Sequence, residues 1–175
     1  MWYSQAYKKD EIEGDGSLFI ATWLPKEAYV ALDHINNLDD DLHMTIIYSD
    51  NSVNSPVERQ KVLDAVEYVC SVTQPIKCQL TEIGIMGNEE NSKVINITVD
   101  GGAKFYSDLV KKIENILDKG LKLDYDFLPH CTVNFKSKSK TINIDDLRKF
   151  KWKMEEITVQ FGDDKSKKYK FKLGE

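Results

Sequence analysis

Two seven-residue segments repeat one pattern, LHMTIIY at residues 42–48 and PHCTVNF at residues 129–135. In both, a threonine follows a histidine by two positions, and apolar residues lie between and after them. Side chains two positions apart on a β-strand share a face, so each His and Thr would face one way and the apolar residues would face a core. This pattern gives four candidate catalytic residues: His43, Thr45, His130 and Thr132.

The length and composition predict a single globular domain over residues 1–175, with residues 1–16 as an N-terminal extension. No apolar run approaches the roughly 20 residues of a membrane helix, and the first segment lacks the apolar core of a signal peptide. The three cysteines form no CxxC pair, which predicts reduced thiols. The expected location is the cytoplasm, the host cytoplasm if the chain is phage-encoded, without a membrane partner.

The charge is acidic overall and uneven along the chain. The formal net charge of −5 argues against broad binding of long nucleic acid, which needs many lysine and arginine contacts to phosphate. Residues 136–175, however, carry 12 Lys and Arg against 7 Asp and Glu. This basic quarter would either attract a small anionic ligand or form a solvated surface.

Hydrophobic periodicity predicts an alternation of strands and helices. The expected strands are 17–24, 42–48, 76–86, 93–99, 130–135, 154–161 and 167–173, and the expected helices are 25–36, 55–72, 105–119 and 145–150. Gly120 is expected to close the third helix at its C′ position. Each half of the chain contains a strand, a helix and then a His-Thr strand, which suggests a pseudo-twofold domain with a central cleft.

Two facing imidazoles suit the cleavage of a phosphodiester. Histidine titrates near neutral pH, so one ring can remove a proton from the nucleophile while the other protonates the leaving oxygen. The transition state carries extra negative charge, to which the Thr45 and Thr132 hydroxyls are suited to donate hydrogen bonds. The scheme requires no metal and no cofactor, and the motifs lack the additional ligands of a zinc site.

The sequence resembles the 2H phosphoesterases over about residues 17–173. Two His-x-Thr motifs, one in each half of a chain of this size, define that superfamily, and both are present here without substitution. Leu24-Pro25 and Pro129 add to the similarity. The resemblance implies a bilobal, pseudo-twofold α+β fold in which two antiparallel sheets form a central cleft flanked by helices. It also implies that the two His-Thr pairs are catalytic and work without a metal.

The superfamily includes RNA 2′,5′-ligase-like proteins, cyclic phosphodiesterases and phage nucleases of the anti-CBASS type, which degrade cyclic-oligonucleotide immune signals. The acidic charge and the lack of an arginine beside the second motif favour a small substrate, a cyclic nucleotide or cyclic oligonucleotide. One alternative is an RNA-end enzyme, a 2′,3′-cyclic phosphodiesterase or 2′,5′-RNA ligase-like protein acting on short RNA ends. The other is a module that binds nucleotides without turnover.

Further residues are candidates for binding the substrate. These are the aromatic residues that could stack on a base and a lysine that could contact phosphate: Tyr7, Trp23, Trp152 and Lys136. Tyr48 has the same strand parity as Met44, which predicts that it packs inward. Cys131 alternates away from His130, so the sequence predicts a core thiol rather than a nucleophile.

Overall fold

The computed structural model describes residues 16–32, 42–85, 93–123, 126–133, 144–162 and 167–174. The strands are β1 (Leu18–Trp23), β2 (His43–Ser49), β3 (Ile76–Ile85), β4 (Lys93–Val99), β5 (His130–Thr132), β6 (Lys151–Met154), β7 (Glu156–Phe161) and β8 (Tyr169–Lys172). The helices are α1 (Lys26–Ala31), α2 (Pro56–Ser71), α3 (Gly102–Leu117) and α4 (Ile144–Arg148). The ends expected for helix 25–36 and strand 130–135 lie outside the described residues.

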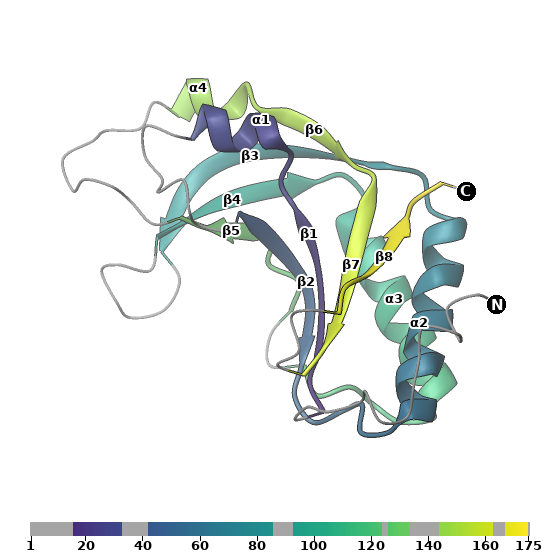
Figure 1. The fold of residues 1–175 in the computed structure, drawn as a ribbon. Coiled ribbons are helices and arrows are strands. Elements are labelled where there is room, and N and C mark those ends of the chain that lie inside the picture. The colour runs from purple at the N-terminus through teal and green to yellow at the C-terminus, as the bar shows by residue number, and fades with distance from the viewer. Residues whose placement is uncertain are drawn as a thin grey trace.

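The strands form one curled antiparallel sheet in the order β6-β3-β4-β5-β2-β1-β7-β8 (Figure 1). The expected α+β fold is therefore confirmed, and the two expected sheets are the four-stranded halves of this continuous sheet, joined where β5 pairs with β2. Each half places its His-Thr strand at this central seam. The pseudo-twofold repetition in the sequence thus brings both motifs to the middle of the sheet.

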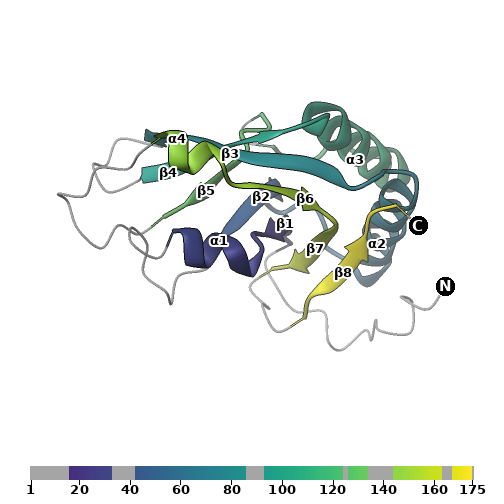
Figure 2. The same ribbon diagram turned by 90° about the horizontal axis from the view of Figure 1, so that it is seen from above.

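The helices pack at different places around the sheet. Figures 1 and 2 show α2 and α3 side by side at one end, with α1 well away from them near β6. Phe105, Leu109 and Ile113 recur at a spacing of four residues and bury one face of α3. None of the helices in the described ranges is long and apolar enough to cross a membrane.

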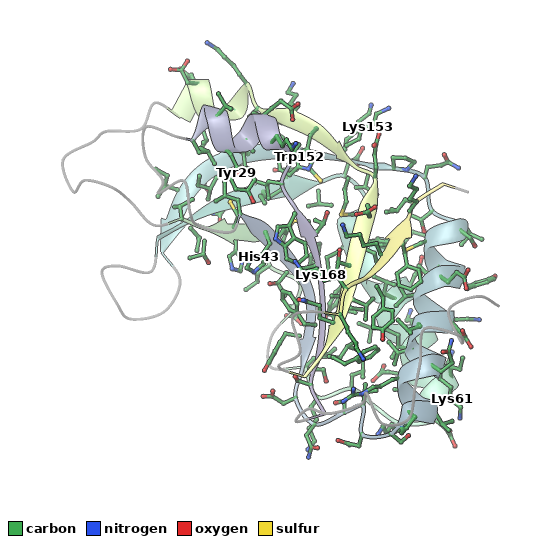
Figure 3. The ribbon with its side chains drawn as sticks, in the orientation of Figure 1. Tyr29, His43, Lys61, Trp152, Lys153 and Lys168 are labelled. Carbon is green, nitrogen blue, oxygen red and sulfur yellow. The ribbon has the colours of Figure 1, made fainter. Side chains whose placement is uncertain are left out.

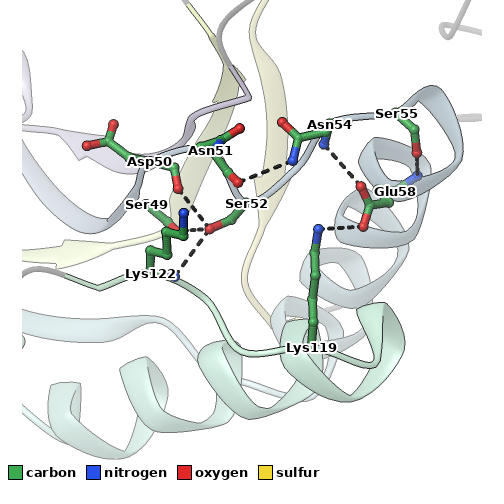
Figure 4. A network of polar contacts seen from close by, with 9 residues as sticks. All are labelled: Ser49, Asp50, Asn51, Ser52, Asn54, Ser55, Glu58, Lys119 and Lys122. Carbon is green, nitrogen blue, oxygen red and sulfur yellow. Dashed lines mark hydrogen bonds and ion pairs between the residues drawn. The ribbon is translucent and has the colours of Figure 1, made fainter.

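A network of polar contacts connects the end of β2 to both long helices (Figure 4). The side chain of Ser55 caps α2 by accepting a hydrogen bond from the backbone N–H of Glu58 at 3.1 Å. The carboxylate of Glu58 in turn forms an ion pair with Lys119, 2.7 Å away, just after α3. Ser52 accepts a hydrogen bond from the backbone N–H of Lys122. These contacts hold the chain that follows the first motif against the segment that leads to the second.

Two expectations about local structure are wrong. The strand expected at 154–161 begins at Glu156 as β7, and the sequence missed β6, which ends at Met154 with only Glu155 between the two strands. The third helix ends at Leu117, and the left-handed residue that follows it is Asp118, with φ 56°, rather than Gly120. Aspartate tolerates this conformation better than most non-glycine residues, so the helix ends without using the glycine.

Candidate active site

The two His-Thr motifs lie side by side at the seam of the sheet. Met44 of β2 is paired with Cys131 of β5 in antiparallel register. Continuing this register by one residue in each direction places His43 beside Thr132, and Thr45 beside His130. Directly opposite residues have Cβ atoms about 5 Å apart and diagonal neighbours are about 7–8 Å apart. The two histidines are such a diagonal pair on one face of the sheet.

The alternation expected from His43 to Thr45 and from His130 to Thr132 is confirmed. Met44 and Cys131 are fully buried, whereas His43, Thr45 and His130 are partly exposed and Thr132 is exposed. Burial raises the pKa of the Cys131 thiol to about 12, so the thiolate does not form near neutral pH. Cys131 is therefore a core residue, and the opposite face carries the four polar side chains.

A backbone carbonyl fixes the orientation of the His130 ring. The Nδ1 atom lies 2.6 Å from the carbonyl oxygen of Leu128. Because a carbonyl can only accept, Nδ1 must carry the hydrogen and donate it. The Nε2 atom is then the one that exchanges a proton with a substrate.

Aromatic side chains of β1 fix the position of the other histidine. Figure 3 shows His43 among the side chains of the central strands. Its ring centroid is 5.7 Å from that of Trp23, its cross-strand partner, and 5.6 Å from that of Phe19. The Nζ atom of Lys168 lies 4.9 Å from the centroid of Trp23. Trp23, predicted from the sequence to bind substrate, thus lies between the candidate catalytic pair and a lysine.

A β-bulge turns Tyr48 outward, so the expectation that it packs inward is wrong. The register of β1 and β2 pairs Ala21 with Thr45 and Ile20 with Ile47, which leaves Ile46 as the extra residue. Ile46 and Ile47 are consecutive and both buried. The bulge therefore reverses the alternation after Thr45, and Tyr48 is 37% exposed on the face that carries the histidines.

A cavity of about 340 Å³ opens beside His130, and we call it the Tyr48 cavity. Its volume is within the roughly 300–1,000 Å³ range of small-molecule sites. It is lined by Phe19, Thr45, Ile46, Ile47, Tyr48, Tyr106, Leu123, Asp126, Leu128 and His130. Tyr106 and Asp126 belong to α3 and to the segment before β5. No local pattern singled them out, because only the pairing of β5 with β2 brings that segment to the site.

A second cavity, of about 430 Å³, lies next to Trp23, and we call it the Trp23 cavity. Its lining includes Trp152 and three lysines from β6 and the β8 region: Lys153, Lys168 and Lys170. The structure thus brings two of the predicted substrate-binding residues, Trp23 and Trp152, to one cavity. Trp152 also pairs with buried Cys78 and packs partly against the core. Tyr7 and Lys136 lie outside the described residues.

Asn96 is a further polar residue beside the motifs that the sequence did not indicate. It is the β4 partner of His130 across the strands. A Cβ atom at Gly84 would lie 3.1 Å from the Asn96 amide nitrogen, so the glycine leaves room for this side chain. Among the described residues, no group of three His, Cys, Asp or Glu side chains is placed to hold a metal ion.

Comparisons with known proteins agree with this architecture. The family model described as "2'-5' RNA ligase superfamily" matches residues 22–161. No curated protein matches the sequence. Among solved structures, TT0787 of Thermus thermophilus has a TM-score of 0.66 at 18% identity, covering 91% of this chain and 99% of its own.

Two further structures share the fold. E. coli LigT in its apo form gives a TM-score of 0.59 at 16% identity, with 93% of this chain and 100% of that chain covered. The PDE domain of MHV ns2 gives 0.51 at 14% identity, with 83% and 99% covered. At these low identities the structural matches show likeness of fold alone. The family model, in contrast, matches most of the chain. The chain therefore belongs to the 2'-5' RNA ligase superfamily, the 2H phosphoesterases, and is an enzyme of the phosphodiesterase class.

Proposed function

We propose that this chain is a metal-independent phosphodiesterase that hydrolyses a small nucleotide, with cyclic nucleotides or cyclic oligonucleotide signals of the anti-CBASS type as the favoured substrates. The observation that carries the proposal is the antiparallel pairing of β2 with β5 around Met44 and Cys131. This pairing makes the two histidines diagonal neighbours on one accessible face. Each histidine also has a threonine hydroxyl of the other motif directly opposite.

The proposed reaction transfers one proton on each side of the phosphorus. One imidazole removes a proton from water as the water oxygen bonds to phosphorus. The other imidazole donates a proton to the ester oxygen as its bond to phosphorus breaks. Each transfer contributes about 10²–10⁴ in rate. Thr45 and Thr132 donate hydrogen bonds to the non-bridging oxygens, where negative charge develops.

The surroundings of the four residues favour a small nucleotide over long RNA. Thr45 and His130 line the Tyr48 cavity, and Trp23, the cross-strand partner of His43, lines the Trp23 cavity. Both contain aromatic side chains suited to stacking on bases. E. coli LigT, which shares the fold, has been solved with 3'-AMP and with ATP. The net charge of −5 gives no general attraction for a long polyanion.

A substrate panel in excess EDTA tests this proposal. The panel contains cyclic mononucleotides, cyclic di- and trinucleotides, and short RNAs that end in a 2′,3′-cyclic phosphate, and products are identified by mass spectrometry. We expect turnover of the cyclic nucleotides to survive the chelator. His43→Ala and His130→Ala should each abolish it with an unchanged circular dichroism spectrum, whereas His34→Ala, the remaining histidine, should retain it.

The same panel separates the alternatives. Preferential hydrolysis or joining of RNA ends would show an RNA-end enzyme and would contradict the proposal of a cyclic substrate. Saturable binding without any product over long incubation would show a nucleotide-binding module. Loss of turnover in EDTA that is restored by a divalent metal would contradict the metal-independent mechanism.

A further inference from the structure

Among the described residues that line it, the Tyr48 cavity combines aromatic walls with one carboxylate, that of Asp126. We propose that it binds the nucleobase next to the scissile phosphate and that Asp126 makes it selective for guanine. This inference rests on the proposed function, because it assumes that a nucleotide places its phosphate between the two histidines.

The cavity is continuous with the candidate catalytic residues. Thr45 and His130 belong to its lining, so a phosphate held by them lies at its mouth. The nucleoside attached to that phosphate on the His130 side is then directed into the cavity. The cavity volume of about 340 Å³ is within the range of sites that bind small molecules such as a nucleoside.

Aromatic and apolar surfaces in the cavity are available to a flat ligand. Phe19 and Tyr48 are cross-strand partners on the outward face. The Tyr48 hydroxyl donates a hydrogen bond to Asp50 at 2.8 Å, which restrains the ring. Tyr48 is 37% exposed and Leu128 is 52% exposed, and both line this cavity. Bases stack on such exposed aromatic faces whatever their sequence.

Tyr106 forms a further aromatic wall and lies close to Asp126. The Tyr106 ring stacks on Phe127, with centroids 5.3 Å apart and planes 10° apart. Burial raises the pKa of the Tyr106 phenol, and the negative charges of Asp126 and Glu114 raise it further. Asp126 is therefore close enough for its charge to act on the phenol, and both residues line the cavity.

Asp126 supplies the chemical selectivity. An ionised carboxylate only accepts hydrogen bonds, and its two oxygens can accept from two adjacent donors. Guanine presents two such neighbours, N1–H and the N2 amino group, whereas adenine and cytosine present one amino group and uracil one imide N–H. No lysine or arginine is among the described residues that line this cavity, so its charge complements a base edge rich in donors.

Equilibrium binding tests base selectivity separately from catalysis. The probes are 3′-GMP, 3′-IMP, 3′-AMP and 3′-UMP, titrated by calorimetry against the wild-type chain. Inosine keeps N1–H and lacks the N2 amino group. We expect 3′-GMP to bind about ten-fold more tightly than 3′-IMP, because one charge-assisted hydrogen bond is lost. Equal affinity for all four nucleotides would overturn the inference.

Two variants and a matched control identify the residues responsible. Asp126→Asn should raise the Kd of 3′-GMP about ten-fold or more and leave that of 3′-UMP nearly unchanged. Tyr48→Ala should weaken all four nucleotides by roughly ten-fold, and Tyr48→Phe should restore them. Asp118→Asn, a similar exchange at the left-handed cap of α3, should change none of these constants. Persistence of the guanine preference in Asp126→Asn would contradict the assignment.

The outcomes also separate this inference from the proposed function. Guanine-selective binding without turnover of any substrate in the panel would overturn the phosphodiesterase proposal alone. Turnover with equal affinity for every base would overturn the guanine site alone.

Discussion

The Nδ1 atom of His130 lies 2.6 Å from the carbonyl oxygen of Leu128, two residues earlier in the chain. This bond determines which nitrogen of the candidate catalytic ring is available. We expect neutral His130 to carry its hydrogen on Nδ1, although the Nε2 atom carries it in most free histidines. Long-range ¹H–¹⁵N correlation spectra at high pH measure this directly. A neutral ring protonated on Nε2 would contradict the geometry.

Removal of either threonine hydroxyl should lower kcat. Thr45→Val and Thr132→Val keep the shape of the side chain and remove the proposed donor to the phosphoryl oxygens. We expect kcat to fall by about 10²–10³ with a smaller change in KM, because the donor acts on charge that develops in the transition state. Thr→Ser at the same positions should retain most of the rate. An equal loss in Ser and Val variants would argue for a packing role.

The three cysteines should resist alkylation in the folded protein. Cys70, Cys78 and Cys131 are buried, and burial raises the pKa of each thiol to about 12. The reactive thiolate is therefore scarce at pH 8. We expect iodoacetamide to label none of them in the native chain and all of them in concentrated urea, as read by mass spectrometry. Rapid native labelling of Cys131 would show that β5 is not packed as described.

Loss of the α2 cap should destabilise the fold. Ser55→Ala removes the hydroxyl that accepts from the Glu58 backbone, and we expect the free energy of unfolding to fall by about 1 kcal/mol. Urea titration followed by circular dichroism measures the change. Ser71→Ala, at the exposed far end of the same helix, is the control and should change stability by less than about 0.5 kcal/mol.

The Glu58–Lys119 ion pair should make the free energy of unfolding depend on pH in the acid range. The hydrogen bond from Lys119 is the largest influence on Glu58 and lowers the pKa of its carboxyl below the ordinary 4.5. The folded state is therefore stabilised above pH 4.5, and this contribution is lost as pH falls through the lowered pKa. Lys119→Met should reduce the difference in urea midpoint between pH 7 and pH 3. An unchanged difference would show that the pair is fully screened.

Local patterns in the sequence were sufficient to predict most elements and the four central residues. Alternation within a strand is set by the backbone, so the shared face of His43 and Thr45 followed from two-residue spacing. The register of β2 against β5 is a long-range property and could only be expected from the repetition of the motif. The match of the family model confirms the family that this repetition indicated.

Features that depend on tertiary contacts could not be predicted. The bulge at Ile46 depends on how β1 pairs with β2, and without it Tyr48 would face the core. At Glu155 the chain passes from β6, at one edge of the sheet, to β7, which lies between β1 and β8 in the other half, and the apolar alternation does not mark this crossing. Asp126 reaches the site because the chain after α3 folds back to β5. Tyr48, Asp126 and Glu155 line the two cavities, whereas the two His-Thr motifs are the residues that identify the family.

The single residue between β6 and β7 has a consequence for how a substrate enters. β6 belongs to one half of the sheet and β7 to the other, so Glu155 is a covalent tether between the lobes. One residue spans at most about 3.6 Å, which leaves no slack for the lobes to swing apart at that side. For the proposed nucleotide substrate, this predicts that binding does not require the two halves of the sheet to separate at that end.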